Sequence, residues 1–360
     1  MEAREVVRRV QLIGRSTYVV SLPKSWARRM GLDRGAPLTI LLEADGSLRI
    51  IPPRMRDSRR PECKLTAHEG MSEGTLVREL MSRYLYGYKV IRVELPTDAR
   101  RLKEVIKRVI ARKMIGVELL EDSERSIVLQ VLVNVEELPV NSVIQRMGQV
   151  TAGMIDDSME GLYARNPGLL DDVILRDDFV DKLYLYLLRQ LNAGVRGFVG
   201  IEEIGLRSLE EVIEYAVVGK SIERIADHAQ KIATNARQLL EMKIPISALE
   251  EELRAMTKLA KEVFQSSIRC FMHRDRECAL ALLDEYPPRL AEAERRFVEK
   301  IMEEPCDARR HMVARLIADS LKRICDYSMD ILEAAVDLSL EEGAQGPRSL
   351  SVTAKTSAAP

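Results

Sequence analysis

The chain has 360 residues, of which 46% are apolar and 31% charged. This is the composition of a globular protein with room for two or three domains, and it excludes a chain that is disordered throughout. No apolar run approaches about 18 residues and the N-terminus has no signal-type segment, so the sequence predicts a cytoplasmic protein. The five cysteines are odd in number and lack metal-type spacing, so reduced, buried thiols are expected.

The net charge of −1 conceals an uneven distribution along the chain. Residues 1–60 hold 13 Lys and Arg against 6 Asp and Glu, a net charge of +7. The other residues hold 42 against 50, a net charge of −8. A basic segment joined to an acidic body indicates that one end meets a polyanion, with a chance surplus of surface arginine as the alternative.

Residues 6–52 have the pattern of short strands around one short helix. The expected elements are strands at 6–12, 17–22, 38–43 and 48–51, a helix at 23–30 that Gly31 closes, and turns at Gly14-Arg15 and Asp45-Gly46. So small a unit has little core, and it contains no cysteine for a disulfide. Obligate dimerisation is therefore expected.

Six cations cluster around these first strands and the helix, and such a set can neutralise phosphates and reach guanine edges. They are Arg8, Arg9, Arg15, Lys24, Arg28 and Arg29. Gly14-Arg15 and the run Leu22-Pro-Lys-Ser-Trp-Ala-Arg-Arg-Met-Gly-Leu32 resemble the SpoVT/AbrB family, whose members are dimeric swapped-hairpin β-barrels that bind DNA. The resemblance implies a DNA-binding domain at 1–56, with the arginines as its contacts and Trp26 as a core anchor. A barrel that only dimerises is the alternative.

Residues 54–63 are polar and indicate a linker, and a small α/β domain is expected at 62–137. Its expected elements are helices at 72–87 and 98–113 and strands at 89–95, 116–120 and 126–134. No catalytic motif occurs in it, and the sequence does not indicate its role.

From Pro139 onward the pattern is that of long helices in two sets of three, typical of a bundle. The expected helices are 139–165, 168–192 and 203–241 in a first repeat (138–242), then 247–273, 275–303 and 307–341 in a second (246–341). The tail at 342–360 is small and polar, and is expected to be disordered. The fold class is thus multidomain and mainly α, with a β-barrel and an α/β unit before the bundles.

One amphipathic segment, Ser221–Ala233, recurs as Ser320–Leu332, and only the first copy has two acids four residues apart. Glu223 and Asp227 lie about 120–160° from the apolar face, so they are expected outside the core. Two more pairs share helix faces, Asp178 with Asp181 and Asp157 with Glu160. Such pairs can share a hard cation, although most are solvated faces.

The runs Asp178-Phe-Val-Asp-Lys-Leu183 and Ile222-Glu-Arg-Ile-Ala-Asp-His-Ala229 resemble the PhoU family over 139–340. Its members are oligomeric regulators of phosphate uptake that carry iron, zinc or other divalent metals on the bundle surface. The resemblance implies metal ligands at Glu223, Asp227, Asp178 and Asp181. It also implies a phosphate ABC transporter ATPase or a sensor kinase as partner.

The second repeat departs from this pattern, because Lys322 aligns with Glu223 and Pro288 with Asp181. A lysine repels a divalent metal and a proline perturbs its helix, so metal is expected in the first repeat only. His228 is expected to be exposed rather than a ligand.

The sequence therefore predicts a phosphate-responsive regulator that binds DNA through its N-terminal domain and represses phosphate transport. A second hypothesis is a scaffold that dimerises through the barrel and contacts the transporter without binding DNA. A third, a metal hydrolase, is disfavoured because no general acid or base and no nucleophile motif accompany the acids. The chain is accordingly not expected to be an enzyme.

Overall fold

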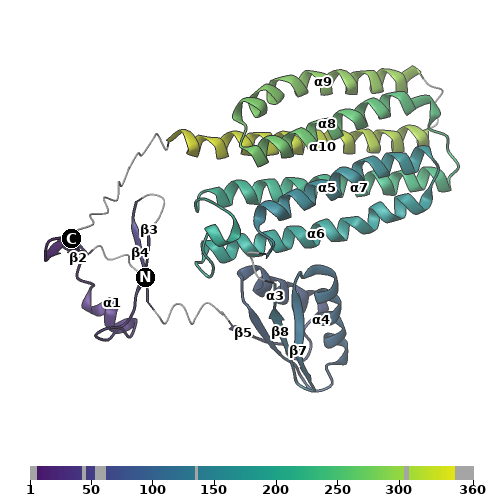
Figure 1. The fold of residues 1–360 in the computed structure, drawn as a ribbon. Helices are drawn as coiled ribbons and strands as arrows, with labels where there is room; N and C mark the ends of the chain where they lie inside the picture. Colours follow the sequence, from purple (N-terminus) through teal and green to yellow (C-terminus); the bar gives the residue numbers. More distant parts are fainter. Residues whose placement is uncertain (1–5, 43–45, 53–61, 134–136, 304–307, 345–360) are drawn as a thin grey trace, which may run out of the picture. The chain divides into compact units, whose positions relative to one another are not determined.

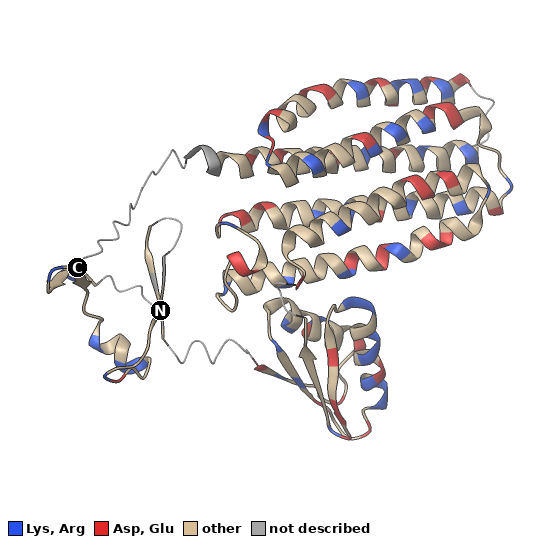
Figure 2. Cartoon of the chain, in the orientation of Figure 1, with Lys and Arg blue, Asp and Glu red and all other residues tan. Residues whose placement is uncertain are grey.

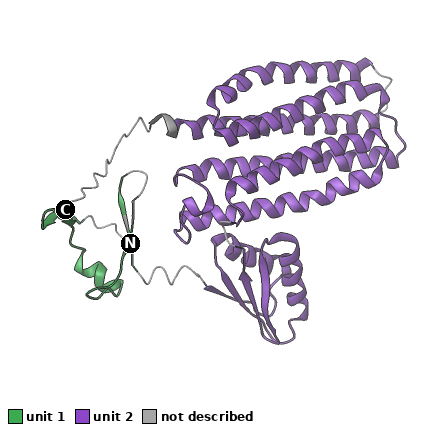
Figure 3. Ribbon diagram, viewed as in Figure 1, with its two compact units in different colours: residues 1–61 green, residues 62–360 purple. Residues whose placement is uncertain are grey.

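The computed structural model describes residues 6–42, 46–52, 62–133, 137–303 and 308–344. These residues form two compact units, one within 1–61 and one within 62–360 (Figures 1 and 3). The expected Asp45 turn residue, most of the 54–63 linker, Cys306 and the 345–360 part of the tail lie outside the described residues.

The first unit contains two antiparallel hairpins and one short helix. Strand β1 (Gln11–Ile13) pairs with β2 (Thr17–Val19), and β3 (Thr39–Leu42) pairs with β4 (Leu48–Ile51). Between them lies α1 (Lys24–Arg29), after which Gly31 takes a left-handed φ of 64°. The positions of the helix and of the second hairpin are as expected.

The first two strands are shorter than the sequence predicts. Residues 6–10 and 20–22 belong to no strand, and the described residues of one chain form two separate hairpins rather than a closed barrel. Large apolar side chains consequently stay in solvent, with Val7 78%, Tyr18 75% and Leu48 62% exposed.

The second unit begins with an α/β segment whose four-stranded sheet has the order β5-β6-β8-β7. Its elements are β5 (Glu62–Thr66), α3 (Glu73–Tyr86), β6 (Val90–Glu94), α4 (Arg100–Lys113), β7 (Val117–Ser123) and β8 (Ser126–Val131). Strand β5 runs parallel to β6, and the other pairs are antiparallel. The sequence missed β5, because its first two residues end a polar, proline-containing stretch that is typical of a linker.

Helix α6 (Pro167–Val195) holds this sheet segment to the bundle. The guanidinium of Arg189, 8% exposed, donates to the Tyr84 carbonyl at 2.5 Å and to the Gly87 carbonyl at 3.3 Å. A Cβ on Gly87, whose φ is 105°, would lie 3.1 Å from the ring of Phe198. The α/β segment and the bundle are thus joined by close backbone approach and a buried cation.

Six long helices form the bundle, and Figure 1 shows them side by side and roughly antiparallel. They are α5 (Val140–Tyr163), α6, α7 (Glu211–Glu241), α8 (Glu250–His273), α9 (Arg276–Glu303) and α10 (Ala308–Ala344). Asn166 caps α6 by accepting from the Leu169 amide, with Pro167 in the first turn, so this expected break is a true helix start. Helix α7 begins eight residues later than expected, after the short 3₁₀ turn Glu202–Ile204.

The two three-helix repeats share one continuous apolar core instead of forming two separate bundles. Helices α7 and α10, which carry the duplicated segment, pack against each other along this core. Tyr327 of α10 contacts the ring of His228 at 5.8 Å between centroids and lies 5.3 Å from the Arg224 guanidinium. The expected tail also starts later, because α10 continues to Ala344.

The expectation of reduced thiols is wrong for two cysteines of the second repeat. Cys270 and Cys278 form a disulfide, because the turn between α8 and α9 brings their Cα atoms within 6.1 Å. Helix α9 includes Pro287 and Pro288, in agreement with the expected helix at 275–303. Within the described ranges, no helix is long and apolar enough to cross a bilayer.

Candidate functional site

The acids predicted from the repeat lie where α6 packs against α7, and they form an acidic cluster there. Glu223 and Asp227 come from α7, and Asp177 and Asp181 come from α6. The pKa of Asp177 is raised to about 7, first by burial and then by repulsion from Asp227, Asp181, Asp178 and Glu223. Burial and the charges of Glu223 and Asp227 raise the pKa of Asp181 as well. The four carboxylates therefore interact electrostatically.

The acidic cluster is less exposed than the helical phase of α7 predicts. Glu223 and Asp227 are half-buried, and the Glu223 side chain is only 13% exposed. The phase correctly places both acids away from the core of α7, but it contains no information about α6, which covers them. Their site is thus a seam between two helices rather than a convex surface.

Asp177 is the member of the acidic cluster that sequence reasoning missed. It forms an i, i+4 pair with Asp181, the same spacing as Glu223 with Asp227, and this signal could have found it. Its Oδ1 atom is buried without a hydrogen-bond partner among the described residues. Asp178, which the sequence chose instead, is exposed and lies at the edge of the cluster.

The acidic cluster has the donor chemistry for a hard cation, but not yet the geometry. Carboxylate oxygens are suitable ligands for such ions. A bound cation would relieve the repulsion among the carboxylates and would give the buried Asp177 Oδ1 atom a partner. Lys220 already pairs with Glu223 at 2.5 Å. In the described ranges, no three His, Cys, Asp or Glu side chains are arranged to hold a metal. Binding would therefore require these side chains to change rotamer.

The equivalent position in the second repeat holds an internal ion pair. The Lys322 ammonium lies 3.1 Å from both carboxylate oxygens of Asp326, and Arg323 lies 3.7 Å from one of them. Two cations therefore occupy the surroundings of the single remaining acid. This agrees with the expectation that the repeats differ in charge at this position.

His228 is half-buried between the repeats, so the expectation that it is exposed is wrong. The α7–α10 contact desolvates its ring, and burial lowers its pKa to about 4. The nearby Lys231 lowers this pKa further, whereas Asp227 opposes the shift. The imidazole is therefore neutral at pH 7 and packs against Tyr327.

All six cations predicted to bind DNA are exposed in the N-terminal unit. None of them forms an ion pair with another residue that the structure describes, and the guanidinium of Arg8 contacts only the Val7 carbonyl, at 3.4 Å. Lys24, Arg28 and Arg29 all lie on α1, and Trp26 on the same helix is half-buried. The charges of this surface are thus uncompensated within the described chain.

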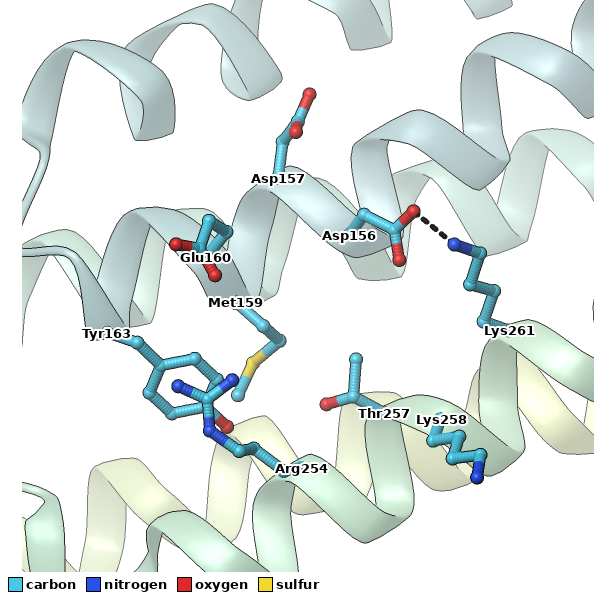
Figure 4. Close-up of a pocket in the computed structure, with 9 residues that line it drawn as sticks. All are labelled: Asp156, Asp157, Met159, Glu160, Tyr163, Arg254, Thr257, Lys258 and Lys261. Atoms are coloured by element: carbon cyan, nitrogen blue, oxygen red, sulfur yellow. Dashed lines mark hydrogen bonds and ion pairs between the residues drawn. The ribbon is translucent and has the colours of Figure 1, made fainter.

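A hollow of about 470 Å³ lies between α5 and α8, one helix from each repeat (Figure 4). Asp156 pairs with Lys261 at 2.5 Å, and the Arg254 guanidinium stacks over the Tyr163 ring at 3.8 Å. The lining residues are Asp156, Asp157, Met159, Glu160, Tyr163, Arg254, Thr257, Lys258 and Lys261. Acids and cations are equal in number in this lining, so the hollow has no preference for a ligand of either charge. The predicted pair Asp157 and Glu160 lies here rather than in the acidic cluster.

This combination of fold and site defines a two-repeat helical bundle fused to a small basic hairpin domain. Residues 144–236 and 253–335 match the model of the PhoU domain, and residues 11–58 match the model described as "Antidote-toxin recognition MazE, bacterial antitoxin". The chain belongs to the PhoU family, and it carries two PhoU domains behind an N-terminal domain of the MazE/AbrB type.

Curated relatives carry the name phosphate-specific transport system accessory protein PhoU homolog. That of Xylella fastidiosa is 23% identical over 212 residues, which cover 57% of this chain and 84% of the relative. That of Aquifex aeolicus is 25% identical over 197 residues, covering 54% and 86%. The crystal structure of PhoU from Pseudomonas aeruginosa has a TM-score of 0.49 at 21% identity, and covers 56% of this chain and 96% of that one. That from Streptococcus pneumoniae has a TM-score of 0.48 at 18% identity, with coverages of 57% and 95%.

Proposed function

We propose that this protein is a DNA-binding regulator of phosphate transport. The observation that carries the proposal is the fusion of two PhoU domains to an exposed, uncompensated basic domain of the MazE/AbrB type. The named relatives are accessory proteins of phosphate-specific transport systems, which supports a role in phosphate transport. The bundle responds to phosphate status, and the N-terminal domain acts on the genes concerned.

DNA binding is supported by the chemistry of the N-terminal cations. Guanidinium groups bind phosphates in bidentate fashion and read guanine in the major groove, which ammonium groups do less specifically. Arg15 follows the β1–β2 turn residue Gly14, and Arg28 and Arg29 end α1, where the helix dipole favours cations. The dipole explains why these two arginines are tolerated, but not why none of the six cations has an acidic partner among the residues that the structure describes.

Dimerisation is supported by the apolar surface of the same unit. Val10, Ile13 and Ile40 are 59–60% exposed, in addition to Val7, Tyr18 and Leu48. A domain this small does not leave so many large apolar side chains in water unless another chain covers them. A second copy that contributes the complementary hairpins buries them.

Titration of DNA with the full chain tests the proposal. The probe is a labelled duplex from a phosphate-transport promoter of the source organism, compared with a random duplex at rising salt. Arg15→Ala and Arg28→Ala should each weaken specific binding by about 1–3 kcal/mol. Arg34→Ala, an exposed arginine outside the predicted set, is the matched control and should bind normally. Equal affinity for both duplexes would contradict specific readout.

A scaffold that does not bind DNA is the second candidate, and the exposed apolar residues favour it equally. In that case the N-terminal unit only dimerises the chain, and the bundle contacts the phosphate transporter ATPase or a sensor kinase. Negligible DNA affinity at low salt, together with an intact dimer by light scattering, would select this candidate.

The acidic cluster is proposed to hold a divalent or iron-type cation. Glu223, Asp227, Asp177 and Asp181 would hold the ion, whose positive charge would relieve their mutual repulsion. The side chains of α6 and α7 that now repel each other would thereby become attracted to one shared centre. Such a change would tighten the packing of α6 against α7.

Elemental analysis tests the metal proposal directly. Glu223→Ala/Asp227→Ala should lose most of the metal that copurifies with the wild-type protein. Lys322→Ala/Asp326→Ala changes the equivalent positions of the second repeat and should keep the wild-type content. Equal metal content in all three proteins would refute a site in the first repeat.

A further inference from the structure

Helix α4 carries an unusual density of positive charge. Seven of its 14 residues are basic and one is acidic; the basic ones are Arg100, Arg101, Lys103, Lys107, Arg108, Arg112 and Lys113. Its buried residues, Val105, Ile106 and Val109, pack into the core of the α/β segment. The remaining surface forms a basic face, defined as Arg100, Arg101, Lys107, Arg108 and Arg112, which spans about 140° of the helix and includes one exposed acid, Glu104. Figure 2 shows Lys and Arg along this helix.

Acidic neighbours compensate only part of this charge. Arg101 pairs with Glu73, and Lys107 shares Asp122 with Lys103. The other three members of the basic face are exposed and form no ion pair with a described residue; they are Arg100, Arg108 and Arg112. The face therefore keeps a positive potential in the folded protein.

The needs of the helix itself do not explain this pattern. Cations in the last turn, such as Arg112, are favoured by the negative end of the helix dipole. Arg100 and Arg101 are in the first turn, where the dipole disfavours cations, and that turn has neither an acid of its own nor a side-chain cap. The pair with Glu73 offsets Arg101, so Arg100 is the cation of this turn without an ion pair to a described residue.

The basic face is presented on a firmly held element. The Lys182 ammonium of α6 donates to the Ala111 carbonyl at 2.8 Å, and Arg189 fixes the same segment through Tyr84 and Gly87. The charge of Lys113, at the end of α4, opposes the rise in the pKa of Asp181 on α6. Both attachments lie toward α6 and leave the basic face in solvent.

We infer that the basic face of α4 is a second DNA-contact surface, which binds the phosphate backbone. This inference rests on the proposed DNA binding by the N-terminal unit. Only ten residues separate Ile51 at the end of β4 from Glu62 at the start of β5. Even fully extended, they span at most about 35 Å. The linker keeps both units on one chain, so DNA held by the N-terminal unit is at a raised effective concentration for the second unit.

The composition of the face favours DNA over a membrane. Within the basic face the only apolar side chain is that of Ala111, so the helix has no large residue to insert among lipid tails. Arginine outnumbers lysine four to one in the face, and guanidinium matches phosphate geometry in bidentate fashion. A backbone contact of this kind adds affinity and salt dependence, but no sequence preference.

Salt-dependent DNA titration of the full chain tests the inference. Arg108→Ser/Arg112→Ser should raise Kd roughly tenfold near 100 mM salt and lower the steepness of log K against log salt by about 2. Arg108→Lys/Arg112→Lys should retain the wild-type slope, because it keeps both charges. The matched control is Arg295→Ser/Arg296→Ser on α9, which removes two exposed cations elsewhere and should leave the slope unchanged.

The outcomes separate this inference from the function on which it rests. If wild-type protein binds DNA and the α4 serine variant has the same slope, the second surface is refuted while binding by the N-terminal unit stands. Absence of any wild-type binding at low salt removes both. Binding to vesicles of anionic phospholipid that the α4 variant loses, with an unchanged DNA slope, would assign the face to lipid and overturn the inference.

Discussion

Ionisation of Asp177 destabilises the folded protein. Its pKa lies near 7 because burial and four neighbouring acids disfavour the charged form. Between the ordinary aspartate pKa of 3.8 and this value, the folded protein keeps a proton that the unfolded chain has released. The free energy of unfolding therefore falls as pH rises through this window.

Asp177→Asn should remove that pH dependence in metal-free protein. At pH 8 the variant should be more stable than the wild type by about 1 kcal/mol, less than the full linkage value because the site is partly open to solvent. The gain should vanish near pH 4, where the wild-type carboxyl is protonated. Urea unfolding at both pH values, with a chelator present, measures it.

Asp178→Asn is the matched control for this effect. Asp178 is exposed, so its loss should change stability at pH 8 much less. Equal stabilisation by both variants would mean that general charge reduction, and not the buried position of Asp177, governs the pH dependence.

Sequence reasoning found three of the four acids of the acidic cluster, Glu223, Asp227 and Asp181, for a definite reason. The spacing of Glu223 and Asp227 and the apolar phase of α7 are local properties, and both were predicted. Helix α6 buries Glu223 and Asp227, and Tyr327 buries His228. Both effects depend on the orientation of neighbouring helices, which the sequence of α7 alone does not determine. The choice of Asp178 over Asp177 is the exception, since the i, i+4 pair with Asp181 was visible in the sequence.

At the scale of elements, the helices of the bundle were predicted almost to their ends, apart from the start of α7, because their breaks carry strong local signals. Asn166-Pro167 combines a capping side chain with a proline in the first turn. Strand β5 and the shared core were not predicted, because each depends on partners distant in sequence. Similarly, the Cys270–Cys278 disulfide follows from a turn geometry that cysteine spacing alone does not indicate.

The seam between α6 and α7 allows a test of packing beside the acidic cluster. A Cβ on Gly219 of α7 would overlap Cδ2 of the buried Leu187 on α6. Gly219→Ala should therefore lower the free energy of unfolding by about 1 kcal/mol, because overpacking exceeds the gain in helix propensity. Chemical denaturation measures this difference.

Gly153→Ala on α5 is the matched control and should have the opposite sign. A Cβ there would meet only the flexible guanidinium of Arg176, at 3.4 Å. The gain in helix propensity, about 0.5–1 kcal/mol, should then be retained. Stabilisation by both alanine variants would show that the α6–α7 seam adapts more freely than its packing indicates.

At the scale of the whole molecule, positive and negative charge are separated along the chain. The cations are concentrated in the N-terminal unit and on α4, whereas the acidic cluster lies in the first PhoU domain. In the second PhoU domain Lys322 stands at the position of Glu223 and pairs with Asp326. The two PhoU domains thus differ in charge at equivalent positions, although both contribute to one apolar core.

The central claim is that a PhoU-family protein acts on genes through its own DNA-binding domain. Chromatin immunoprecipitation of the full chain, under phosphate-replete and phosphate-starved growth, tests it most directly. The account predicts enrichment at phosphate-transport promoters that changes with phosphate supply and is lost in Arg15→Ala/Arg28→Ala. Enrichment no greater than at random genomic sites in both conditions, with normal protein levels, would contradict it.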